Sequence, residues 1–409
     1  MSPDEVQTPA RRGSQKMVTD FADTAIDSAR MTSTARSPAH PRNPGWLSRF
    51  PEAGLLVVIV VLGALLTLFG GSVRVPKMER GSDGEMQRVF MTNAAGEREL
   101  VFETRNKFCN AQNLAQVAKD TSFIAIIAVG MTFVIITGYI DLSVGAIYAL
   151  ASVLAALVLH AYGPDGSHPG QPMIGALLGA VTCLGVGTLC GLVNGGMFVA
   201  LKVHPFIITL GTMSIFRGIA FVTTSGQSVG SFPQSFLSLI RWEPIAGLRM
   251  LPTFVMVLVT IVGGIYLQRL AAGRRIYAVG GNELAARYSG IRVGRVKLSV
   301  YLIAGFLSGL AALMGIGYYG AATSGDGSGA ELKAIAAAVV GGASLNGGRG
   351  SALGALLGAV IIQMIESGLI TLGIDQNYSQ IIIGAMVIVA VLLDRLNNWL
   401  AQRRLTKVS

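Results

Sequence analysis

Six polar side chains lie within or at the edges of long apolar runs, and they are the residues of this sequence that could do chemistry. They are Asp141, Asn194, Arg217, Glu331, Lys333 and Glu366. A polar group in such surroundings is costly, so it usually lines a solute or ion path or pairs with another buried group. These six residues are therefore the candidates for a functional site in this sequence.

Two of the six also have a structural interpretation. Asp141, in the string GYIDLSVG, is expected to accept backbone N–H bonds at the start of the helix that follows it. The alternative is that it lines a pathway. Asn194 lies between Gly191 and Gly195, a pair spaced for close helix packing. Its amide either bonds a neighbouring helix, which we favour, or faces the solute.

The other four residues are predicted to form two ion pairs. Arg217, Glu331, Lys333 and Glu366 fall at comparable depth in the outer halves of their apolar runs. We expect Arg217 to face Glu331 and Lys333 to face Glu366. The alternative for Lys333 is that its flexible stem carries the ammonium group to the outer surface.

Nothing in the sequence resembles the assembled site of a hydrolytic or redox enzyme. It has no GxxxxGK[ST] phosphate loop, no HExxH and no cluster of His and Cys ligands. Its three cysteines show no metal-ligand spacing, and Cys183 and Cys190 are expected to be small packing residues. We expect no enzyme activity, metal or cofactor in this chain.

Composition indicates that most of the chain lies in a membrane. Hydrophobic residues make up 52% and charged residues 13%, whereas a soluble domain is about one-quarter charged. We predict an all-α integral membrane protein with about ten transmembrane helices and lipid around them. The expected spans lie near 52–70, 113–137, 141–161, 172–200, 206–224, 251–269, 298–320, 329–344, 350–373 and 378–394. The string GALLGAV occurs at Gly175–Val181 and Gly354–Val360, which would suit a five-plus-five inverted repeat.

The net charge of +10 is explained by membrane topology better than by nucleic-acid binding. The cations lie at the ends of apolar runs, as the positive-inside bias requires, and form no basic patch. Ten spans place a disordered tail (1–50), the loop 272–297 and the C-terminal tail (399–409) in the cytoplasm. The transmembrane domain is expected over 51–398. Its segment 71–101 would be an insertion outside the membrane, either a β-hairpin or a linker.

The loop 272–297 is expected to carry a short capped helix between two spans. Asn282 suits the N-cap, residues 283–289 favour a helix, and Gly290 suits the position after its C-cap. One acid, Glu283, stands among six cations: Arg274, Arg275, Arg287, Arg292, Arg295 and Lys297.

Four strings together resemble the sugar-type permeases of bacterial ABC importers, the ribose, xylose, arabinose and galactose group. They are Ala128–Leu150, Val203–Val222, Ala278–Val293 and Glu331–Ala359, and the resemblance covers roughly 102–395. It implies a multi-pass subunit of the bacterial inner membrane that imports a monosaccharide or related polyol. The implied partners are a cytoplasmic ATPase that binds the ATP, a second permease copy or close paralogue, and a periplasmic solute-binding protein.

The resemblance also assigns a role to the loop, as the coupling helix on which the ATPase docks. Asn282, Glu283, Ala285, Ala286 and Gly290 match the family's docking motif, and the adjacent Arg287 suits an acidic or carbonyl-lined groove on the ATPase. A short helix fixed between two spans can transmit a rigid-body motion. The chain departs from the family in its long tail, the insertion 71–101, and Lys333 and Glu366.

Two other functions compete with the importer. An ion-coupled secondary transporter or channel would use the intramembrane acids as a relay. A receptor-like membrane protein would bind an outside partner through the 71–101 insertion. Which sugar or polyol is carried is not encoded in any of these motifs.

Overall fold

The computed structural model describes residues 52–80, 86–92, 96–244 and 249–386, together with 388, 389 and 392. The predicted tails 1–50 and 399–409 lie outside the described residues. Within the described part the chain is mostly helical, as expected. The description "all-α" is incomplete, because short β-ladders also form.

Seven helices of the described part are long and apolar enough to cross a membrane. They are α3 (Ala111–Ile136), α4 (Val144–Ala161), α5 (Pro172–Leu201), α6 (Pro205–Thr224), α8 (Leu251–Arg269), α11 (Val293–Tyr319) and α13 (Ala352–Thr371). The described part also contains a shorter apolar helix, α2 (Ala53–Phe69), and the 11-residue helix α12 (Ala330–Val340). The tenth expected span is helical over 378–386, and its remainder lies mostly outside the described residues. Ten spans and the inverted repeat stay predictions.

The core is built around α3 and α11, whose most apolar stretches are 89% and 78% buried, against 28% or less in α5, α6 and α8. Glycine permits close contact between α5 and α11. A Cβ added at Gly187 or Gly191 would collide with the backbone of α11 at Gly305 and Tyr301. Small residues let these two backbones approach, as in other membrane helix pairs.

The segment between α2 and α3 forms three antiparallel ladders. Strand β1 (Ser72–Pro76) pairs with β6 (Phe102–Asn106), β2 (Met78–Arg80) with β3 (Met86–Arg88), and β4 (Phe90–Thr92) with β5 (Arg98–Leu100). The last pair is the hairpin expected in the 71–101 insertion, although Asn93–Ala95 of its turn lie outside the described residues. A ring of backbone hydrogen bonds among Lys77, Val89 and Val101 joins the three ladders, with N–O distances of 2.7–3.0 Å.

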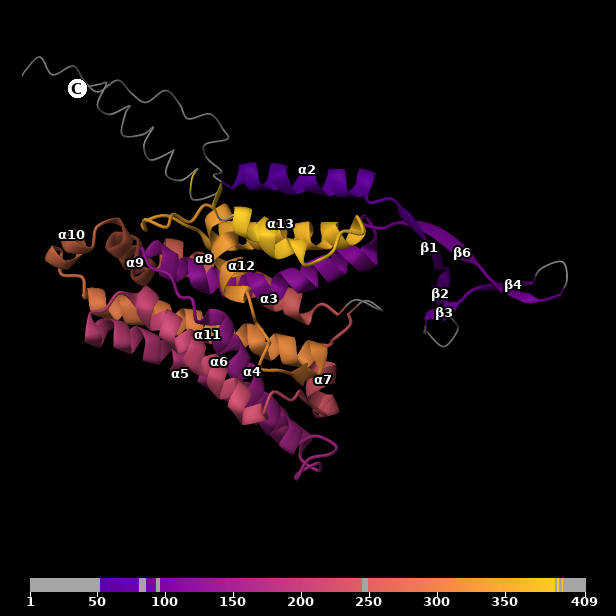
Figure 1. Cartoon of the computed structure of the whole chain (residues 1–409), viewed down its shortest axis with the longest axis horizontal. Helices are drawn as coiled ribbons and strands as arrows, with labels where there is room; N and C mark the ends of the chain where they lie inside the picture. Colours follow the sequence, from indigo (N-terminus) through magenta and orange to yellow (C-terminus); the bar gives the residue numbers. More distant parts are fainter. Residues whose placement is uncertain are drawn as a thin grey trace, which may run out of the picture. The chain divides into compact units, whose positions relative to one another are not determined.

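The ladders and the short helices α9 (Ala271–Gly281) and α10 (Glu283–Tyr288) lie at opposite ends of the helical bundle (Figure 1). A fourth ladder, β7 (Val229–Gly230) with β8 (Ala321–Ala322), contacts α4 and α11, and the short helix α7 (Gln234–Ile240) follows β7 in the chain. The stretch 272–281 was expected to be loop and is helical instead. Its backbone is hydrogen-bonded as α9, and Gly273, Ile276 and Val279 form the buried face.

Candidate functional site

The short helix α10 has the caps that its sequence predicts. The Asn282 side chain accepts a hydrogen bond of 2.9 Å from the Ala285 N–H. At the other end Gly290 has a φ of +82°, a conformation that glycine adopts without strain. The N–H groups of Gly290 and Ile291 return to the carbonyls of Arg287 and Ala286. These two hydrogen bonds form a Schellman motif at the C-terminus of α10. Both ends of the helix are therefore fixed by residues next to it in the sequence.

Glu283 attaches α10 to the membrane helices through one carboxylate. Its Oε2 accepts a hydrogen bond of 3.0 Å from the Tyr139 hydroxyl, in the break between α3 and α4. The same atom lies 2.9 Å from Nζ of Lys297, in the first turns of α11. Arg287, one turn along α10, is 3.5 Å away and exposed. The carboxylate therefore joins three elements that are distant in sequence.

Aromatic rings complete the attachment. The Lys297 ammonium lies 4.9 Å from the ring centre of Tyr139 and 4.6 Å from that of Phe198, at the end of α5. Both distances fit cation–π attraction. The Tyr139 and Phe198 rings meet edge to face at 4.8 Å, and His204, the N-cap of α6, lies 6.1 Å from Tyr139. Ends of α5 and α6 thereby contact the same cluster.

The protonation of Glu283 follows from this setting. Burial raises its pKa, but hydrogen bonds from Lys297 and Tyr139 and the charges of Lys297 and Arg287 outweigh burial. The pKa of Glu283 therefore lies below its usual value, and the carboxylate is ionised at neutral pH. A charged, multiply bonded carboxylate holds α10 more rigidly than an apolar contact of the same size would.

The preceding helix α9 is fixed to a different pair of elements. The Tyr277 hydroxyl donates to the Gly350 carbonyl at 2.7 Å, in the loop before α13. Gly280 packs so closely on the Ile136 carbonyl of α3 that a Cβ would collide with it. The same carbonyl accepts a hydrogen bond from Gly348 N–H at 2.8 Å. Together α9 and α10 contact the ends of α3, α11 and the α12–α13 loop.

The opposite face of α10 has no partner within the described residues. Leu284 is 60% exposed and Tyr288 82% exposed, one turn apart on the helix. Ala286, predicted as a docking residue, is buried and packs inward, whereas Ala285 and Gly290 are exposed. A cleft of about 620 Å³ opens beside α10, between Lys202 and His204 on one side and Arg287 and Lys297 on the other. Sequence reasoning missed Leu284 and Tyr288 because it followed polar residues only.

Asp141 and Asn194 are both buried inside the helical bundle, where both contact Ser143. Asp141 Oδ1 accepts from the Ser143 N–H at 2.8 Å and from its hydroxyl at 2.6 Å, so Asp141 does accept a backbone N–H just before α4. Asn194 donates to the Ser143 hydroxyl at 2.7 Å, joining α5 to the same point. The bonding of Asn194 to a neighbouring element is confirmed.

The predicted pairing of Arg217 with Glu331 is wrong. The Arg217 guanidinium donates to the carbonyls of Ser324 and Asp326, at 2.9 and 3.2 Å. These carbonyls lie in a tight loop in which Asp326 accepts bonds from Thr323. The Glu331 carboxylate instead lies against Gly145 at the start of α4, where an added Cβ would collide with it. Backbone carbonyls satisfy Arg217, so it needs no carboxylate.

The predicted pairing of Lys333 with Glu366 is confirmed. Nζ of Lys333, on α12, lies 2.6 Å from Oε1 of Glu366, on α13. The Glu366 side chain is 8% exposed and that of Lys333 27% exposed. The ammonium therefore does not leave the protein for the surface, which rejects the alternative for Lys333.

Lys119 is a buried cation that sequence reasoning missed. Its side chain is 3% exposed, lies 2.7 Å from Asp120, and stands 4.1 Å from the ring centre of Tyr318 on α11. The signal was available, because a Lys-Asp dipeptide interrupts the apolar run of α3. Such a pair in a membrane helix predicts an interior contact.

Seven long apolar helices with polar groups buried among them define a multi-pass membrane protein. The model of the family "Branched-chain amino acid transport system / permease component" matches residues 113–391. The ribose import permease of Bacillus subtilis (strain 168) is 39% identical over 289 residues, covering 70% of this chain and 86% of the relative.

The names of other relatives specify different sugars. The D-allose transport system permease protein of Escherichia coli (strain K12) is 37% identical and covers 71% of this chain and 85% of its own. The fructose import permease of Rhizobium meliloti is 34% identical, with 71% and 79% covered. No solved structure matches. The chain belongs to the family of sugar-type ABC importer permeases.

Proposed function

We propose that this chain is the membrane-spanning permease subunit of an importer that moves a monosaccharide or related polyol into the cytoplasm. A separate ATPase would dock on α9 and α10 and supply the energy. The observation that carries the proposal is the two-faced character of α10. One face is fixed to the bundle through Glu283, and the other presents Leu284 and Tyr288 to no partner in the described residues.

An exposed apolar pair on a rigidly held helix is suited to a protein interface. Aromatic and large apolar residues that fill a pocket on the partner supply most of the binding energy in such contacts. The surrounding Arg274, Arg275 and Arg287 are exposed and would favour an acidic or carbonyl-rich rim. The anchored face would then pass movement of the ATPase to α3, α11 and the loop before α13.

The remaining partners follow from the same proposal. The ladders at the opposite end of the bundle would face the periplasm, where a solute-binding protein would deliver the sugar, and both termini would be cytoplasmic. A second permease copy or close paralogue would complete the pathway. Asp141, Asn194, Arg217, Glu331, Lys333 and Glu366 are its proposed polar residues, with the solute taking hydroxyl contacts from some of them.

The decisive experiment purifies the tagged chain from its native cells and measures associated ATPase and sugar uptake in proteoliposomes. We expect ATP-dependent uptake, and loss of both ATPase association and uptake when Leu284 and Tyr288 are replaced by Asp. The control Phe90→Asp, at the opposite end, should retain the ATPase. Uptake that follows an ion gradient without ATP would overturn the proposal in favour of a secondary transporter.

A further inference from the structure

A groove of about 420 Å³ runs between α2 and the rest of the bundle. Helix α2 packs on α13 and forms one wall, with Ile59 and Gly63 facing the groove. Leu114 and Val117 of α3 form the opposite wall. Met364 of α13 lies at its floor and is buried with Val117 in one apolar cluster. Packed apolar side chains therefore form both the walls and the floor of the groove.

The polar side-chain groups that line the groove are the thiol of Cys109 and two threonine hydroxyls. The two hydroxyls that line it are both satisfied within their own helices, because Thr67 donates to the Gly63 carbonyl and Thr121 to the Val117 carbonyl, each at 2.7 Å. No charged side chain lines it. An apolar space of this kind does not hold ordered water. Its occupant must therefore be apolar.

The dimensions of the groove match one leaflet of a bilayer. At the helical rise of 1.5 Å per residue, the lining stretch from Ile59 to Thr67 spans about 12 Å, and that from Leu114 to Thr121 about 10 Å. Half of the hydrocarbon core of a bilayer is about 15 Å thick. One extended acyl chain entering from one leaflet would follow this length.

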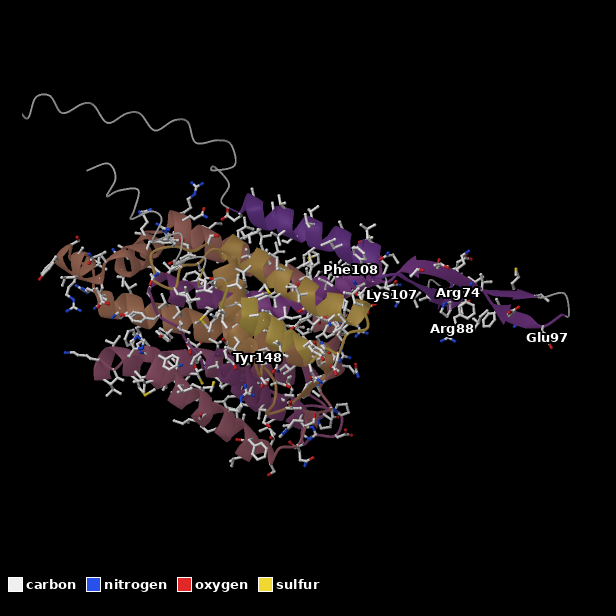
Figure 2. All side chains as sticks on the ribbon, turned by 45° about the horizontal axis from the view of Figure 1, so that its top comes forward. Arg74, Arg88, Glu97, Lys107, Phe108 and Tyr148 are labelled. Atoms are coloured by element: carbon white, nitrogen blue, oxygen red, sulfur yellow. The ribbon has the colours of Figure 1, made fainter. Side chains whose placement is uncertain are left out.

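A cation stands where the groove meets the strands. Phe108 and Cys109 line that end, and Figure 2 shows Lys107 and Phe108 together at the junction of helices and strands. Lys107 is exposed and has no ion pair within 4.0 Å among the described residues. Its neighbour Arg105 is already engaged with Glu103 and Gln112. Lys107 is thus free to meet a phosphate at the depth of lipid headgroups.

We propose that this groove binds one acyl chain of an anionic phospholipid, with the lipid phosphate at Lys107. The outward face of α2, including Val60 and Leu68, is exposed and apolar, so the groove opens toward lipid. A lipid so held would fill the space between α2 and α3 and would stabilise the position of α2. The inference needs only the membrane location and does not depend on the solute carried.

The test uses purified full-length protein and native mass spectrometry with phosphatidylglycerol added. We expect one retained phosphatidylglycerol per chain, at least fivefold less in Gly63→Phe, whose side chain fills the groove, and no change in Gly54→Phe. Gly54 is the matched control because it lies on the same helix, with open space around it and no part in the groove. Lys107→Gln should lower the preference for phosphatidylglycerol over phosphatidylcholine at least fivefold.

A second measurement uses the wild-type chain alone. Cys109 is exposed, whereas Cys183 and Cys190 are buried, so maleimide labelling reports on the groove. Added phosphatidylglycerol should slow labelling at least fivefold. Unchanged labelling, or equal lipid retention in Gly63→Phe and Gly54→Phe, would overturn the proposal. Loss of self-association in Gly63→Phe without loss of lipid would assign the groove to a second copy and would also overturn it.

Discussion

The hydroxyl of Tyr139 donates a hydrogen bond of 3.0 Å to Oε2 of Glu283, which lies 144 residues further along the chain. Two residues after Tyr139, Asp141 binds Ser143, and Ser143 in turn accepts from Asn194 in α5. Two groups of polar contacts, one at α10 and one inside the bundle, are thus joined by the two residues of backbone that separate Tyr139 from Asp141. Contiguity alone does not prove energetic coupling, so these contacts have to be tested by perturbing their members in pairs.

The first prediction is that Tyr139→Phe and Glu283→Gln are not additive. Tyr139→Phe removes one hydrogen bond to a charged group and should cost about 1–2 kcal/mol of stability. Glu283→Gln also leaves Lys297, whose side chain is 13% exposed, without its counter-charge. The double variant should therefore cost less than the sum of the singles, by at least about 0.5 kcal/mol. Denaturation in detergent of the purified wild type, the two single variants and the double variant gives the free energies of unfolding for this double-mutant cycle.

Arg287→Gln is the control for this cycle. Its ion pair with Glu283 is 3.5 Å long and the Arg287 side chain is 66% exposed. Exposed pairs of this kind contribute less than about 1 kcal/mol. A stability loss from Arg287→Gln as large as that from Glu283→Gln would show that the Glu283–Arg287 ion pair, and not the Tyr139 contact, stabilises α10.

The second prediction concerns pH. The pKa of Glu283 is lower in the folded chain than its ordinary value of 4.5. The ionised carboxylate therefore adds stability above about pH 4.5, and this contribution is lost as the pH falls through the folded pKa. The stability difference between the wild type and Glu283→Gln should be constant from about pH 6 to 8 and should shrink below about pH 4.5. A difference that grows on acidification would contradict the assigned direction.

The sequence predicted the membrane helices well because their signal is local. Long apolar runs marked the bounds of α2, α5, α6, α8 and α13 to within two residues. The caps of α10 were equally local, since Asn282 and Gly290 act through neighbouring backbone. Lys333 and Glu366 could be paired because opposite charges at equal depth in apolar segments have few other partners.

What the sequence did not predict depends on loops and on backbone groups. Arg217 bonds two carbonyls in a loop whose folding around Asp326 has no signature in the sequence. Tyr139 could have been found, because the predicted topology already placed the GYID break on the same side as Glu283. Leu284 and Tyr288 were missed since exposed apolar residues on a six-residue helix resemble ordinary helix composition.

The third prediction concerns Gly290. Its φ of +82° strains any residue with a Cβ, although the space around it is open. Gly290→Val should cost about 1–2 kcal/mol and disturb the end of α10, whereas Gly290→Asn should cost less, because Asn tolerates this conformation. We expect sugar uptake to fall severalfold in the Val variant and to be largely retained in the Asn variant. Equal uptake in the two would mean that the C-terminal cap of α10 has no part in transport.

The last prediction concerns the ion pair between Lys333 and Glu366. It compares the loss of one of the two charges with the loss of both. Lys333→Met leaves Glu366, whose side chain is 8% exposed, without a counter-charge in the bundle. Breaking a buried pair on one side typically costs about 3–5 kcal/mol. The double change Lys333→Met with Glu366→Leu removes both charges and should restore most of that stability, because an apolar pair needs no desolvation of ions.

Thermal unfolding measures stability, and sugar uptake measures function. If the double variant is stable but inactive, the pair serves the solute. If it is stable and active, the pair is structural. A double variant no more stable than Lys333→Met would show that the unpaired Glu366 charge is not what destabilises the single variant.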